Sequence, residues 1–77
     1  MMTLRQLRDH LDATPFKPFS VRMVSGKTLP VEHPEYVWVP PKSDGSFLVS
    51  EMSGRMHHLD IECVEAFEVL PRLKKAS

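Results

Sequence analysis

The sequence predicts an α+β domain, mostly β, in which one N-terminal helix precedes a five- or six-stranded antiparallel sheet that curls towards a small barrel. Apolar residues recur at helical spacing only before residue 15, and the apolar period changes to two after residue 18. Short turns rich in Gly, Ser and Asp join the alternating segments. Connections this short allow only antiparallel pairing, because parallel strands need a long crossover.

The helix is predicted to begin after Thr3 and to end before Pro15. Thr3 is a favourable N-cap, and Gln6 follows at the spacing of a capping box. The apolar stripe consists of Leu4, Leu7 and Leu11. A helix of about ten residues is marginal alone in water, so this stripe is expected to dock on the sheet.

The segment Pro15-Phe16-Lys17-Pro18-Phe19 predicts a stiff connector whose two rings enter the core. Its P-x-x-P spacing also fits a polyproline recognition motif. We favour the rigid joint, because short patterns of this kind arise often by chance.

Two hairpins with Ser-Gly turns are predicted. The first joins strands at 19–23 and 28–33 through Ser25-Gly26, and Pro30 places its second strand at an edge of the sheet. The second joins strands at 47–52 and 55–59 through Ser53-Gly54. A short strand at 36–39 and a turn-rich loop at 40–45 lie between the hairpins.

The last predicted elements are one helical turn at 60–63, capped by Asp60, and a strand at 64–70 that Pro71 ends. One globular domain is therefore expected over 1–71, followed by a basic, disordered tail at 72–77. The predicted core comprises Leu4, Leu7, Leu11, Phe19, Val21, Met23, Leu29, Val31, Val37, Val39, Leu48, Leu59, Val64 and Phe67.

Composition excludes several classes of protein. The 77 residues contain ten basic and ten acidic side chains, so an overall basic field that would attract nucleic acid is absent. The single cysteine excludes an internal disulfide, and the apolar runs are too short for a membrane span. A cytoplasmic location without membrane attachment is expected.

The zero net charge conceals a segregation along the chain. Residues 1–30 carry five basic against two acidic side chains, residues 31–70 carry two against eight, and residues 71–77 carry three basic ones. Such asymmetry suits association between copies. Ordinary pairing within one chain, or a solvated surface, is the favoured explanation.

Several motifs resemble those of a group of small bacterial proteins. They are Thr3-Leu4 with Leu7, the joint Pro15-Phe16-Lys17-Pro18-Phe19, Gly26, and the step His33-Pro34-Glu35-Tyr36-Val37. The resemblance implies a bacterial source and a compact domain, and it carries no activity over to this chain.

A second resemblance is architectural. A leading helix, strands around Val21-x-Met23-Val24-Ser25-Gly26, and a turn at Ile61-x-x-Val64 before the last strand are similar to the Sm-like barrel. This similarity implies an SH3-like barrel, ring assembly and RNA binding. The chain departs from the pattern at Pro30 and at His33-Pro34-Glu35-Tyr36, which replaces the usual RNA-contact region.

The densest group of reactive side chains comprises His57, His58, Asp60, Glu62 and Cys63, with His33 as a further candidate. Neighbouring histidines on a strand point to opposite faces, and no C-x-x-C or H-x-x-x-H spacing is present. Cys63 is expected to be a small buried hydrophobe rather than a nucleophile. The sequence therefore predicts no metal, no cofactor and no enzymatic activity.

The favoured function is a non-catalytic protein-interaction module that binds another copy of itself or another protein. The candidate contact residues are Tyr36, Trp38, Met52 and Met56, with His33 near the rim. Interfaces favour aromatic residues and Met, and edge strands of a small domain gain from being covered. Packing of the two methionines or of one aromatic ring into the core is the competing interpretation. The alternative function is an Sm-like RNA-binding protein.

Overall fold

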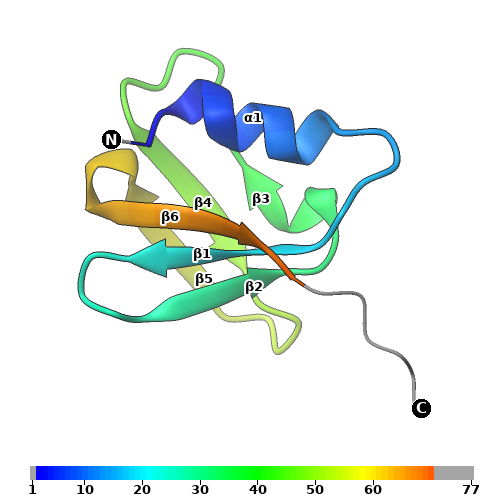
Figure 1. Ribbon diagram of the computed structural model, residues 1–77. Helices are drawn as coiled ribbons and strands as arrows, with labels where there is room; N and C mark the ends of the chain where they lie inside the picture. Colours follow the sequence, from blue (N-terminus) through cyan, green and yellow to red (C-terminus); the bar gives the residue numbers. More distant parts are fainter. Residues whose placement is uncertain (1, 71–77) are drawn as a thin grey trace.

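The computed structural model describes residues 2–70, which form one α-helix, two short 3₁₀ helices and six antiparallel strands (Figure 1). The elements in chain order are α1 (Leu4–Asp12), β1 (Phe19–Met23), β2 (Thr28–Val31), the 3₁₀ helix η1 (Pro34–Tyr36), β3 (Val37–Trp38), β4 (Ser46–Ser50), β5 (Met56–Asp60), the 3₁₀ helix η2 (Ile61–Cys63) and β6 (Val64–Val69). The predicted fold class is confirmed. The predicted tail at 72–77 lies outside the described residues.

The strands form two three-stranded sheets, with the orders β2-β1-β6 and β3-β4-β5. The break falls between Val31 and Val37, where η1 interrupts the extended chain. Pro34 begins η1 and lacks the N–H that a strand ladder requires. The sheets consequently pack against each other without closing into a barrel in residues 2–70. The predicted strand at 36–39 is reduced to Val37–Trp38, because Tyr36 belongs to η1.

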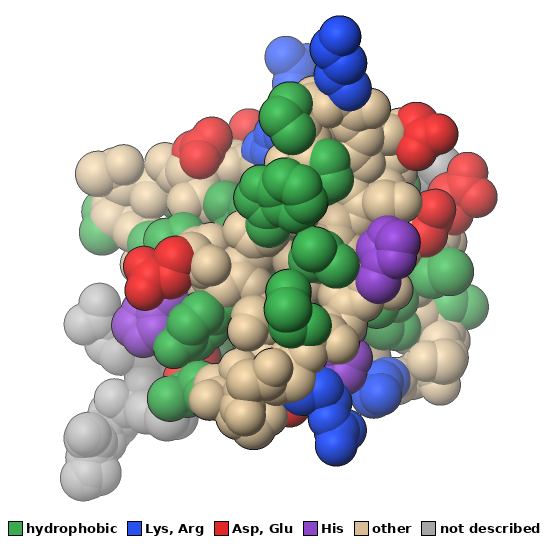
Figure 2. Space-filling view, turned by 180° about the vertical axis from the view of Figure 1, so that it is seen from behind, with side chains coloured by type: hydrophobic (Ala, Val, Ile, Leu, Met, Phe, Trp, Pro, Cys, Tyr) green, Lys and Arg blue, Asp and Glu red, His purple; other side chains and the backbone are tan. Residues whose placement is uncertain are grey.

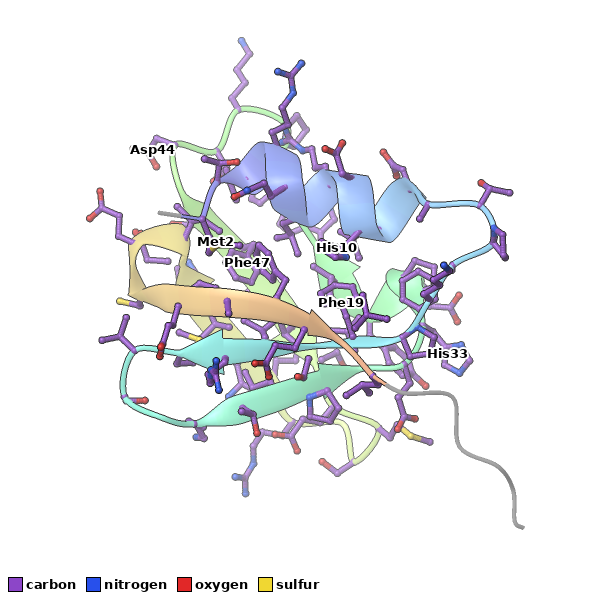
Figure 3. All side chains as sticks on the ribbon, viewed as in Figure 1. Met2, His10, Phe19, His33, Asp44 and Phe47 are labelled. Atoms are coloured by element: carbon purple, nitrogen blue, oxygen red, sulfur yellow. The ribbon has the colours of Figure 1, made fainter. Side chains whose placement is uncertain are left out.

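Helix α1 begins as the sequence predicts and covers one side of the core. The Gln6 N–H donates to Thr3 Oγ1 at 3.1 Å, and the Thr3 N–H donates to Gln6 Oε1 at 2.8 Å. Leu7 is fully buried beneath the helix. The His10 ring lies 4.9 Å from the Phe19 ring, between the helix and the strands (Figure 3).

The two hairpins share one turn geometry, and the turns are longer than the predicted two residues. The Gly26 N–H donates to the Met23 carbonyl at 2.8 Å, and the Met23 N–H donates to the Lys27 carbonyl at 2.8 Å. Three residues therefore form the loop, and Gly26 has φ +96°. Glu51, Gly54 and Arg55 repeat these hydrogen bonds and this φ in the second hairpin.

The core follows the predicted alternation in most strands, with one reversal in β4. Phe47 and Val49 are fully buried, whereas Leu48 is only half-buried and points to the outer face. The prediction of Leu48 as a core residue is therefore wrong. Three apolar residues in succession show no alternation that would identify the inward face. The pairing of Val49 with the buried Val37 directs Val49 inward and therefore Leu48 outward.

Substitution of the two neighbours in β4 tests this alternation. Phe47→Ala removes a fully buried ring and is expected to cost about 3–5 kcal/mol of unfolding free energy. Leu48→Ala is expected to cost less than about 1.5 kcal/mol, because its side chain keeps contact with solvent. Urea unfolding of the two variants beside the wild type measures both values. Equal losses would contradict the assignment of the two faces.

Candidate protein-interaction surface

The outer face of sheet β3-β4-β5 carries a group of exposed apolar side chains. Trp38 lies directly opposite Leu48, and Leu48 lies directly opposite His58. Met56 stands two residues before His58 on β5 and therefore shares this face. Trp38 is 57% exposed and Met56 is 61% exposed. We call Trp38, Leu48 and Met56 the outer apolar strip.

Figure 2 shows the molecule from the side on which this sheet lies. Hydrophobic side chains gather in a band along the middle of that side. Basic side chains lie at the two ends of the band, and acidic side chains lie at its flanks. An apolar centre with a charged rim is the usual layout of a protein–protein contact.

The predicted contact residues do not all come together. Trp38 and Met56 share the outer face, whereas Met52 is 70% exposed in the loop of the β4–β5 hairpin. His33 and Tyr36 lie in and beside η1, with their rings edge to face at 5.4 Å. The interpretation of the two methionines as core residues is excluded by their exposure.

The sequence patterns did not identify three apolar residues that reach the surface. Leu48 joins the outer apolar strip, Val24 is 67% exposed in the β1–β2 loop, and Val69 is 52% exposed at the end of β6. No signal in the sequence identifies Leu48, because Phe47, Leu48 and Val49 are all apolar. The register of β3 against β4 places Leu48 opposite the exposed Trp38.

His57 and His58 point to opposite faces of β5, as predicted, and within residues 2–70 only His57 forms a hydrogen bond with a carboxylate. His57 Nε2 lies 2.5 Å from Glu51 Oε2 across the second hairpin. This hydrogen bond lowers the pKa of the Glu51 carboxyl below its ordinary value, and the Ser53 hydroxyl contributes in the same direction. The pair therefore links the base of the hairpin loop to strand β5.

Cys63 is exposed at the end of η2, so the prediction of a buried thiol is wrong. The turn of η2 places the residue outside the core, which takes Ile61 and Val64 instead. Asp60 accepts a hydrogen bond from the Glu62 N–H at 2.9 Å and so caps η2 as predicted. Within residues 2–70, no three His, Cys, Asp or Glu side chains are placed to hold a metal ion.

Some of the segregated charges form ion pairs within the chain. Arg22 Nη2 of β1 lies 2.9 Å from Glu68 Oε2, and Arg22 Nε lies 4.0 Å from Glu65 Oε1 on β6. This cluster occupies sheet β2-β1-β6, away from the outer apolar strip. It stabilises little on its own, because all three side chains are partly exposed.

Comparison of the chain with protein-family models, curated proteins and solved structures found no match. In the part of the chain that the structure describes, no helix has the length and apolar character that crossing a membrane requires. The proposed function therefore rests on the residues exposed at the outer apolar strip.

The Glu51–His57 hydrogen bond predicts a pH-dependent stability. A carboxyl with a lowered pKa stabilises the folded state above its ordinary pKa of 4.5, and this contribution is lost as the pH falls through the lowered value. Glu51→Gln should therefore be less stable than the wild type at pH 7, and the difference should shrink as the pH falls below about 4. Urea unfolding at both pH values measures it. A difference that is constant with pH would contradict the assignment.

Proposed function

We propose that the protein is a non-catalytic interaction module that self-associates, and that the outer apolar strip is its docking surface. The observation that carries the proposal is the exposure of Trp38 in one row with Leu48, beside the exposed Met56. Trp is the side chain most enriched among residues that dominate binding energy, and Met is enriched at interfaces.

The size of the domain supports a second copy as the partner. A chain of 8.8 kDa buries only about 60% of the surface that its unfolded form exposes, and this one has no internal disulfide. Stacking two such faces about a two-fold axis covers the same apolar strip on both copies. A single free cysteine suits the reducing bacterial cytoplasm that we propose as its setting. The RNA-binding alternative stays a prediction.

Trp38→Ala tests the docking surface. Because the ring is mostly exposed, the substitution should leave the thermal unfolding midpoint of the folded monomer nearly unchanged. It should weaken self-association by on the order of tenfold or more, as expected for a central interface tryptophan. Light scattering and sedimentation velocity across the micromolar range measure the assembly.

Val69→Ala is the matched control, because Val69 is exposed on the other sheet. It should leave the association constant unchanged. A wild-type protein that stays monomeric throughout the micromolar range, or a Trp38→Ala variant with wild-type association, would contradict the proposal.

A further inference from the structure

Among residues 2–70, strand β5 has one backbone edge that pairs with no other strand. It is the last strand in the order β3-β4-β5, and among residues 2–70 it pairs only with β4. The Glu51 N–H donates to the Arg55 carbonyl, and the Ile61 N–H donates to the Gly45 carbonyl, each at 2.8 Å. Positions 55 and 61 are thus bonded on the β4 side. Alternation along the strand then directs the backbone N–H and C=O groups of Met56, His58 and Asp60 away from β4.

An apolar hollow borders the same strand. It has a volume of about 330 Å³, and Met23, Leu29, His57, Leu59 and Cys63 contribute to its lining, whereas no residue of β4 does. The hollow therefore lies beneath the inner face of β5, between this strand and the β1–β2 hairpin. A strand added to the β5 edge would direct every second side chain towards this hollow.

The charges along β5 are opposite at its two ends. Arg55 directly precedes the strand, whereas Asp60 ends it and Glu62 follows. Arg55 forms no salt bridge among the described residues. An antiparallel copy of this segment would bring the basic end of each strand against the acidic end of the other, so the edge is complementary to itself.

We propose that two copies of the chain join along β5 in antiparallel orientation, with the two-fold axis at His58, so that their sheets form one continuous six-stranded sheet. This register sets Met56 opposite Asp60 of the second copy and His58 opposite His58, which uses every outward-directed backbone group of the strand. Leu59 of the second copy lies opposite His57 and points towards the hollow.

The edge contact goes beyond the proposed function, because it uses the backbone of β5 rather than the outer apolar strip. Trp38 lies on β3, with β4 between it and β5, so the two contacts involve separate surfaces. Pairing at the edges also brings the two outer apolar strips into one sheet, with Met56 of each copy beside the seam. Edge pairing and face stacking together give assemblies larger than a dimer.

Charge reversal at the strand ends tests the register. Arg55→Glu and Glu62→Lys should each weaken association about tenfold, since each introduces like charges at both ends of the symmetric contact. The double variant again places opposite charges at positions 55 and 62 and should recover most of the lost association, although Asp60 stays acidic. Arg5→Glu, on the exposed face of α1, is the matched control and should have no effect. Sedimentation velocity in low salt measures the dissociation constants, in the wild-type and the Trp38→Ala chains.

A backbone variant tests the edge directly. His58→Pro removes an N–H that points away from β4, so the β4–β5 ladder keeps its hydrogen bonds while the outer edge is blocked. It should reduce association more than His58→Ala, which keeps the backbone donor. Circular dichroism reports whether the proline variant folds. If it does not fold, the charge-reversal series still decides the outcome.

The outcomes separate the two contacts. Loss of association in Arg55→Glu with recovery in the double variant supports the β5 edge, whatever Trp38→Ala does. Association that is unchanged in Arg55→Glu, in Glu62→Lys and in a folded His58→Pro would overturn the edge contact, and a simultaneous effect of Trp38→Ala would leave the proposed function standing. A protein that is monomeric throughout the micromolar range would overturn both.

Discussion

The packing around Phe19 holds the two halves of the chain together. This ring is fully buried at the start of β1, where it meets His10 of α1 at 4.9 Å, Phe16 of the connector at 6.1 Å and Phe67 of β6 at 6.0 Å. Its backbone pairs with β2 on one side and with β6 on the other. A short helix with little stability of its own is therefore held in place by contact with a ring that belongs to the sheet.

The small number of elements also explains why some surfaces are left uncovered. One helix is enough to close one side of a core this small, and the outer faces of both sheets then meet solvent. On sheet β2-β1-β6 that face carries the charged side chains of Arg22, Glu65 and Glu68, which water solvates well. On sheet β3-β4-β5 the outer face carries the exposed apolar side chains of Trp38 and Met56, whose contact with water is unfavourable. This contrast between the two sheets motivates the proposed docking surface.

The division of the strands into two sheets also leaves strand edges without partners in the part of the chain that the structure describes. A closed barrel has no free edges, but here η1 separates β2 from β3, and β5 pairs on one side only among residues 2–70. Pro30 protects the β2 edge, because proline cannot donate to a further strand. No proline stands in β5. An unprotected edge beside an apolar hollow is the physical basis of the proposed strand pairing.

Local chemistry in the sequence determined the helix, the caps and the positions of the turns, because each depends on neighbours a few residues away. Thr3 with Gln6, Asp60 before η2 and Pro30 at an edge are examples. Local chemistry did not determine the length of the turns, which have three residues instead of the predicted two. The tertiary structure alone decided which side of β4 faces inward, since the run from Phe47 to Val49 has no alternation and only its register with β3 turns Leu48 outward. It also decided that Cys63 is exposed and that Trp38 and Met56 share one face. These outcomes depend on contacts between distant segments, which residue spacing does not encode.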